Sequence, residues 1–227
     1  NCAESSIMRI AAMACRFRKD GSRGLFLSEH RRCYDEIIDY CNKLVYQGKL
    51  KPCRGSIRHD DKNTLKSEFP AMGHFPIEVE SSEKRGSSRF NKEEAQQIIQ
   101  WIATHADKIQ STYPKEGGIE NLIGVITPFK AQAAVIKKAL PKHLKKIRVG
   151  TIHTFQGAEC RIIIISTVYG GEDGCFFIEN NKSLMNVAVS RAKDFFFVFG
   201  NRKCLLHTES STTGLLRQMT EESIAGK

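Results

Sequence analysis

The chain has 227 residues, of which 41% are hydrophobic, which is enough for one substantial globular core. No apolar run is long enough to span a bilayer and the first residues lack a signal-peptide pattern, so a membrane partner is not expected. Lys and Arg total 35 against 25 Asp and Glu, a net charge of +10. This excess favours a polyanionic partner, with nucleic acid first, although a solvated basic surface is the alternative.

The eight cysteines do not occur in the paired CxxC spacing of zinc sites. They are therefore interpreted as reduced thiols of a cytoplasmic protein, with no metal site expected. The first residue is Asn1 rather than methionine, so the chain is expected to be a piece of a longer protein.

The first third of the chain alternates helical patterns with polar breaks. Apolar spacing predicts a helix within residues 1–18, a polar break at 19–24, and a short strand at 25–27. A second amphipathic helix follows, with Gly48 as its C-terminal cap. Residues 49–74 are basic and show no period, which indicates a long loop.

The remaining chain shows strands and helices in turn. Strands are predicted at residues 75–79, 122–126, 147–152, 161–168 and 195–199. Residues 81–89 are read as a polar loop. Helices are predicted from the N-cap Asn91 to about residue 109 and at 129–140 and 184–193, with a weak helix after residue 210. Such alternation predicts an α/β fold with a mostly parallel sheet and helices on both faces. Polar loops at strand ends are where such sheets bind ligands.

Five segments of the chain match motifs of one known family. They are TFQGAE at 154–159, NVAVSRAK at 186–193, ITPFKAQ at 126–132, EHRRC at 29–33, and NKEEA at 91–95. In this order they resemble motif V, motif VI, the ITPYxxQ segment, motif IV and the N-x-x-E-A helix start of superfamily-one helicases. The resemblance is to the second RecA-like domain, in the branch of senataxin and the nonsense-mediated-decay helicases, and it suggests a bacterial member.

The resemblance implies a RecA-like P-loop NTPase fold. It assigns residues 1–24 to a connecting helix and loop from a first motor domain, and residues 25–227 to the second RecA-like domain, with 49–90 as a long basic loop region. No GxxxxGK[ST] loop occurs, nor an acidic Asp-Glu pair ending a strand. The phosphate loop and the magnesium carboxylate are therefore expected from the first domain. Tyr34, Asp35, Arg31 and Arg161 depart from the family pattern.

The resemblance places two arginines on the triphosphate. Arg191 of motif VI is the candidate arginine finger, and its alternative is a helix-terminal arginine paired with a carboxylate. Arg32 of motif IV is the second candidate, although Arg31 beside it could take that role. The planar guanidinium suits bidentate contact with phosphate oxygens.

Motif V supplies the other nucleotide contacts, Gln156, Gly157 and Glu159, the alternative being a tight turn with a solvated carboxylate. Small hydroxyls at strand ends can bind nucleic-acid phosphates without reading sequence. The candidates for this contact are Thr127, Pro128, Thr151 and His153, although a lone histidine is more often structural. The basic residues of 137–148 could add non-specific attraction or form a solvated face.

The sequence thus predicts the C-terminal motor domain of an ATP-dependent DNA or RNA helicase or translocase. Its expected ligands are ATP and Mg²⁺, and its expected partners are single-stranded nucleic acid and the first RecA-like domain of the same protein. The fragment alone is expected to be inactive. The alternative is a catalytically degenerate nucleic-acid or protein-binding module; a dinucleotide-binding enzyme is disfavoured because no GxGxxG follows a strand.

Overall fold

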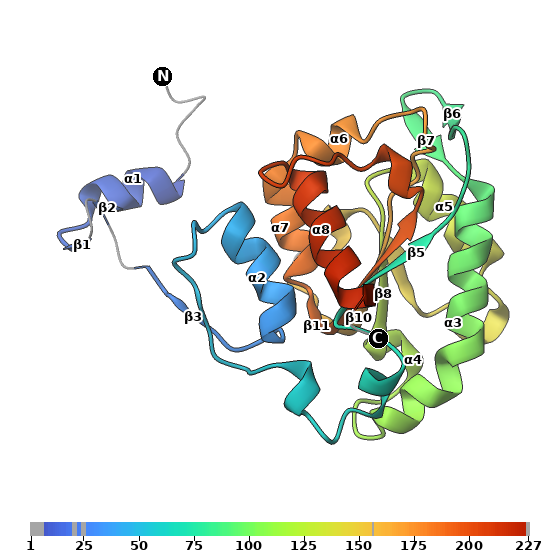
Figure 1. Ribbon diagram of the computed structural model, residues 1–227, viewed down its shortest axis with the longest axis horizontal. Coiled ribbons are helices and arrows are strands. Elements are labelled where there is room, and N and C mark those ends of the chain that lie inside the picture. The colour runs from blue at the N-terminus through green and yellow to red at the C-terminus, as the bar shows by residue number, and fades with distance from the viewer. Residues whose placement is uncertain (1–6, 20–21, 24–25, 156, 226–227) are drawn as a thin grey trace.

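The computed structural model describes residues 7–19, 22–23, 26–155 and 157–225. At its centre five strands form a sheet in the order β5-β11-β10-β8-β9, and every neighbouring pair is parallel (Figure 1). The strands are β5 (Met72–Pro76), β8 (Ile123–Ile126), β9 (Arg148–Gly150), β10 (Cys160–Ser166) and β11 (Ala192–Gly200). The α/β class with a parallel sheet, predicted from the alternation of patterns, is confirmed.

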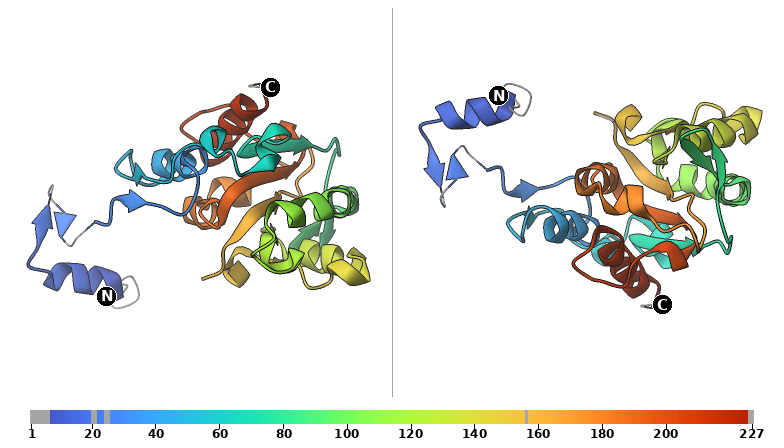
Figure 2. Two further views of the ribbon diagram at one scale, coloured as in Figure 1. Left: turned by 90° about the horizontal axis from the view of Figure 1, so that it is seen from below. Right: turned by 90° about the horizontal axis from the view of Figure 1, so that it is seen from above.

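Helices cover both faces of this sheet. On one face lie α3 (Lys92–Thr112) and α5 (Lys130–Ala139), and on the other lie α2 (Asp35–Leu44), α7 (Lys182–Val189) and α8 (Thr212–Ala225) (Figures 1 and 2). Two short helices lie at strand ends, α4 (Ile119–Leu122) before β8 and α6 (Phe176–Glu179) between β10 and α7. The sheet is therefore shielded from water on both sides, as parallel sheets are.

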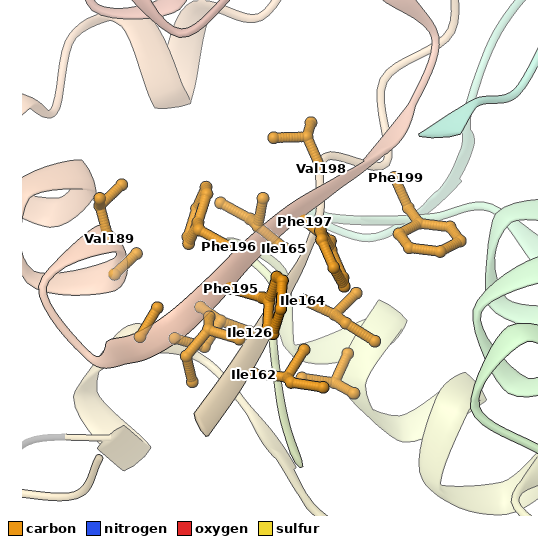
Figure 3. Packing of buried hydrophobic residues seen from close by; sticks show 14 of the residues in the cluster. Ile126, Ile162, Ile164, Ile165, Val189, Phe195, Phe196, Phe197, Val198 and Phe199 are labelled. Carbon is orange, nitrogen blue, oxygen red and sulfur yellow. The ribbon is translucent and has the colours of Figure 1, made fainter. Parts of the chain in front are cut away.

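The core explains why β10 and β11 have no polar face. In β11, Phe196 and Val198 point to one side of the strand while Phe197 and Phe199 point to the other (Figure 3). Both sets are almost fully buried, as are the isoleucines of β10 beside them. Burying one such side chain contributes roughly 1.5–3 kcal/mol, so this strand pair is a main source of stability.

The N-terminal segment and the smaller elements lie around this body. Helix α1 (Ile7–Ala14) lies apart from the sheet (Figure 2). Two-residue strands pair as β1 (Arg18–Lys19) with β2 (Ser22–Arg23) and β3 (Glu29–His30) with β4 (Lys51–Pro52), and β6 (Glu83–Arg85) forms a hairpin with β7 (Ser88–Phe90). The 3₁₀ turns are Ile57–His59, Thr64–Ser67, Lys142–Leu144, Ile152–Phe155 and Arg202–Cys204.

Three sequence predictions are wrong in detail. Phe26 and Leu27 are not in a strand, and Leu25 lies outside the described residues. Residues 49–90 are not a loop throughout, because they contain the edge strand β5 and the hairpin β6–β7. Strand β5 begins three residues before the predicted strand at 75–79. Its residue Gly73 pairs with Phe197, and a Cβ atom added to Gly73 would lie 3.2 Å from the ring of Phe197. The glycine thus removes the apolar signal that would have marked the strand.

One predicted helix cap is confirmed and another is wrong. Asn91 caps α3 as predicted, with its Oδ1 accepting from the N–H of Glu94 at 3.0 Å. Gly48 is not the direct cap of α2, which ends at Leu44; it has φ +76° and closes the turn that follows. The helix expected over 1–18 is found at 7–14, and residues 1–6 lie outside the described residues.

Candidate functional site

The candidate nucleotide residues gather at the amino ends of β10 and β11. Glu159 directly precedes β10 and Arg191 directly precedes β11, where it lies two residues beyond α7 rather than on the helix as predicted. Because these two strands are parallel neighbours, their preceding turns meet at one edge of the sheet, namely the edge formed by the amino ends of the strands. Arg32 reaches the same edge from the segment before α2.

Glu159 holds two cations at this edge. Its Oε2 lies 2.6 Å from Nε of Arg32, and its Oε1 lies 2.7 Å from Nζ of Lys193. The hydrogen bond from Lys193, together with the charges of Lys193, Arg32 and Arg191, keeps the pKa of Glu159 below its usual value. The carboxylate is therefore ionised at neutral pH and fixes both cations beside it.

Arg191 lies against the same turn and is half-buried. Its Nη1 donates to the carbonyl of Ala158, and its Nε to that of Val187, each at 3.4 Å. The Nη1 of Arg32 donates at 3.3 Å to the carbonyl of Ser190, so the two arginine segments touch. Within the described part of the chain Arg191 forms no ion pair with a carboxylate. The carboxylate-paired alternative left open by the sequence is thus not what the structure contains.

An open cavity of about 440 Å³ lies beside these groups. It is lined by Arg31, Arg32, Arg54, Glu159, Arg161 and Lys193. Five of these six side chains are cationic, so the cavity attracts polyanions. Arg31, the alternative to Arg32, is exposed and bonded to Glu29 at 2.7 Å, which leaves Arg32 as the arginine on Glu159.

Two cavity arginines absent from the predicted site are held from behind by the buried Asp194. Nη2 of Arg54 lies 2.5 Å from Oδ1 of Asp194, and its Nη1 donates to the carbonyls of Arg32 and Lys193 at 2.7 and 2.5 Å. Nη1 of Arg161 lies 3.3 Å from both oxygens of Asp194. Nε of Arg161 also donates to Oε1 of Glu116 at 2.8 Å. Asp194 and Glu116 lie 33 and 45 residues from Arg161 in the sequence, so no local pattern signalled these pairs.

The motif V turn is only partly described. Gly157 has φ +79° and nothing within 4 Å of a Cβ, so the turn needs glycine for its backbone conformation and leaves open space beside it. Gln156 lies outside the described residues. Of the three motif V candidates, the structure therefore brings Glu159 and Gly157 to the edge that carries Arg191.

The nucleic-acid candidates lie at the opposite edge. The N–H of Thr127 donates to the carbonyl of Gly150 at 3.0 Å, which joins the carboxyl ends of β8 and β9. Thr127 is fully buried and its Oγ1 accepts from the N–H of Phe129 at 3.4 Å, so its hydroxyl shapes the turn instead of facing solvent as expected. Pro128 and Thr151 are half-buried, and His153 is exposed.

The basic cluster of residues 137–148 does not share the Thr127 edge. Helix α5 starts beside that edge and runs back antiparallel to β8, so Lys137 and Lys138 lie toward the amino ends of the strands. Nζ of Lys145 donates to the carbonyls of Lys137 and Lys138 at 2.7 and 3.0 Å. Lys145 thus satisfies carbonyls at the C-terminal end of α5, which is a structural role.

The described residues contain neither a metal-binding cluster nor a membrane-spanning helix. Across residues 7–19, 22–23, 26–155 and 157–225, no three His, Cys, Asp or Glu side chains form a group that could hold a metal ion. Within those ranges no helix combines the length and apolar character needed to cross a membrane.

Comparison with known proteins places these features in a family. Residues 10–203 match a family model described as an AAA domain (AAA_12). The putative helicase mov-10-B.1 of Danio rerio is 29% identical over 200 residues, 77% of this chain. The RNA helicase Mov10l1 of Homo sapiens is 31% identical over 193 residues, 79% of the chain, and the ATP-dependent helicase upf1 of Schizosaccharomyces pombe is 29% identical over 185, 77% of the chain. The matches span only 15% to 19% of these relatives' own lengths.

Proposed function

Because the chain belongs to this AAA domain family and has the RecA-like α/β fold of its helicase members, we propose that it is the second motor domain of a superfamily-one helicase or translocase. ATP and single-stranded DNA or RNA are its proposed ligands, and a first RecA-like domain of the same protein is its proposed partner. The relatives named above are eukaryotic and give no support to a bacterial source. A cytoplasmic location is also proposed, supported by the seven free cysteines among the described residues.

The observation that carries the proposal is Arg191, an arginine without a carboxylate partner among the described residues, beside a cationic cavity. Phosphoryl transfer needs positive charge on the γ-phosphate as its bond breaks. Among the described residues the hydrogen bonds of the Arg191 guanidinium are two long ones to carbonyls, so phosphate oxygens can replace these without leaving a buried acid unpaired. Such an arginine is suited to act across a cleft on a triphosphate held by another domain.

Arg32 and Glu159 have complementary roles in this proposal. Glu159 orients Arg32 and Lys193 before ATP arrives, which reduces the reorganisation needed to bind phosphate. Glu159 is the one carboxylate among the described residues lining the cavity, and both of its oxygens are engaged. These residues do not fit a Mg²⁺ site, so we assign the magnesium carboxylate to the first domain.

The nucleic-acid strand is proposed to cross the opposite edge of the sheet. Pro128, Thr151 and His153 offer small or polar groups there, and Thr127 fixes the turn that presents them. The cleft between the two motor domains would close when ATP binds and reopen after the products are released. This motion would shift the contacts of this edge along the nucleic-acid strand. The separation of the two edges supports such a two-ended motor.

The test is substitution of Arg191 in the full-length protein. Arg191→Ala should lower the turnover number for ATP about a thousand-fold, and Arg191→Lys should restore little of it. Nucleic-acid affinity should change less than about twofold, because Arg191 lies at the other edge. Arg58→Ala, on an exposed turn, is the matched control and should leave turnover unchanged.

Unchanged ATP turnover in Arg191→Ala would overturn the motor assignment and favour a non-catalytic binding platform. The 227-residue chain alone should hydrolyse ATP negligibly. Strong magnesium-dependent turnover by the chain alone would contradict the two-domain proposal.

A further inference from the structure

Two adjacent phenylalanines in α6 are exposed, whereas the phenylalanines of β11 are buried. Phe176 is 71% exposed and Phe177 is 41% exposed. The segment that carries them links the carboxyl end of β10 to α7. No role in the proposed nucleotide chemistry accounts for these rings, because that chemistry lies at the opposite edge of the sheet.

The ring of Phe177 is placed beside the proposed strand path. Its centroid lies 5.9 Å from that of Phe129, the residue that follows Pro128. The ring of Phe129 lies 5.4 Å from that of Tyr169, and the hydroxyl of Tyr169 accepts from the N–H of Phe177 at 3.2 Å. The buried Tyr169 therefore fixes both the backbone and the ring environment of Phe177. Tyr169 is the buried member of this cluster, Phe129 is half-buried, and the ring of Phe177 is exposed.

Cationic side chains flank the same edge. Oγ of Ser88 accepts from the N–H of Ala131 at 3.0 Å, which holds the β6–β7 hairpin against the start of α5, two residues after Phe129. Lys84 and Arg85 are exposed near the turn of that hairpin. The acid of the same hairpin, Glu83, lies 3.1 Å from Nζ of Lys92 and is balanced by it. The exposed acid Glu172 lies five residues before Phe177, so the two hairpin cations outnumber the one unbalanced acid and attract phosphates.

We infer that Phe177, backed by Phe129, is a stacking surface for a base of single-stranded nucleic acid, with Lys84 and Arg85 contacting the flanking phosphates. The inference rests on the proposed function and extends it by naming the side chain that grips a base. An aromatic ring suits a translocating motor because every base has a π face, so stacking does not depend on sequence. The cations on the hairpin that packs against the start of α5 favour a polyanion over an uncharged protein surface as the occupant.

The test measures binding of a fluorescent oligo(dT) of about 12 nucleotides to the 227-residue chain by anisotropy at several salt concentrations. Phe177→Leu keeps an apolar side chain but removes the π face, and it should weaken binding about tenfold. The slope of log affinity against log salt should stay unchanged, because no phosphate contact is lost. Phe177→Trp should bind like the unsubstituted chain.

Two variants provide matched comparisons. Phe17→Leu removes a ring that is 65% exposed in the N-terminal segment, away from the sheet, and should leave affinity unchanged. The double substitution Lys84→Gln with Arg85→Gln should lower the salt slope by up to about two while leaving the contribution of the ring intact. Together these variants separate stacking from charge.

A direct readout does not depend on the stability of any variant. Irradiation of the unsubstituted chain with an oligonucleotide carrying 5-iododeoxyuridine should give an adduct on the peptide that contains Phe177. Adducts confined to other peptides would overturn the inference, as would Phe177→Leu binding with full affinity, in which case the ring faces another protein surface. Failure of the unsubstituted chain to bind any oligonucleotide at low salt would overturn the proposed function as well.

Discussion

The two ends of the central sheet differ in the kind of group they present. Five cationic side chains and Glu159 surround one cavity beside the amino ends of β10 and β11. Near the carboxyl ends of β8, β9 and β10 lie Pro128, Thr151 and the ring of Phe177, and the cations there are fewer and lie on the β6–β7 hairpin. Dense charge suits a triphosphate whose charge shifts during reaction, whereas neutral and aromatic groups suit a strand that must be released and gripped again.

The interiors behind the two ends differ in the same way. Behind the charged end, Asp194 is ionically paired with Arg54 and Arg161. Behind the carboxyl end, Glu94 is fully buried and accepts from Oγ of Ser166 at 2.5 Å and from the N–H of Val168 at 3.0 Å. Burial raises the pKa of Glu94 to about 8, so this carboxyl is largely protonated at neutral pH. The amino ends are thus supported by the ion-paired Asp194, and the carboxyl ends by Glu94 in its neutral form.

The largest expected effect comes from removing Asp194. Asp194→Asn leaves Arg54 with an uncompensated charge in a partly buried site, whereas Arg161 keeps its ion pair with Glu116. The free energy of unfolding should fall by about 3 kcal/mol. Urea denaturation measures this loss. The control is Asp61→Asn, whose side chain is 96% exposed in its pair with Lys66 and whose removal should not change the unfolding midpoint measurably. Equal midpoints for the two variants would show that the ion pair does not support the charged end.

Arg32→Lys should have the next largest effect. A lysine retains the charge but cannot contact Glu159 and the Ser190 carbonyl together with a planar fork, so the turnover number for ATP in the full-length protein should fall about tenfold or more. Nucleic-acid binding should be unchanged. Arg31→Lys is the neighbouring control, and a loss of turnover in it instead would assign the phosphate contact to Arg31.

The third prediction concerns pH at the other end. Glu94 has a folded pKa of about 8 against an ordinary value of 4.5, so the folded state holds this proton more tightly. Its contribution to stability is full below pH 4.5 and is lost as the pH rises through about 8, at no more than about 1.4 kcal/mol per pH unit. Glu94→Gln should therefore reduce the loss of stability between neutral pH and pH 8.5, as followed by thermal unfolding.

The range from neutral pH to pH 8.5 lies above the range in which a second buried group, His74, titrates. Burial lowers the pKa of His74 to about 4 from 6.5, so its contribution is present above 6.5 and lost as the pH falls toward 4. Equal slopes of stability against pH for Glu94→Gln and the unsubstituted chain between pH 7 and pH 8 would contradict the assignment to Glu94. Because Val168 has φ +75°, strained for a β-branched residue, loss of the Glu94 contact should also loosen the segment leading to Phe177.

The sequence predicted the features that have a local signal. The apolar runs of β10 and β11 and the cap at Asn91 are such features, and motif matching indicated Arg191, Arg32 and Glu159. Arg54 and Asp194 lie 140 residues apart, so no local pattern joins them. Thr127 is buried where its N–H bonds to Gly150 of another strand, a contact 23 residues away in the sequence. Strand β5 carries a weak apolar signal because Gly73 makes room for the ring of Phe197. Contacts between distant segments set what the sequence could not predict.

The smallest expected effect tests whether the two ends are separate in function. Thr151→Val keeps the shape of the side chain but removes its hydroxyl at the end of β9, and oligonucleotide affinity should fall by about threefold to tenfold, the cost of one hydrogen bond. Thr104→Val, exposed on α3, is the matched control and should bind normally. In the full-length protein, ATP turnover at saturating nucleic acid should be retained. If Thr151→Val lowers turnover while binding is intact, the hydroxyl acts on the nucleotide end, and the division of labour between the two ends of the sheet is wrong.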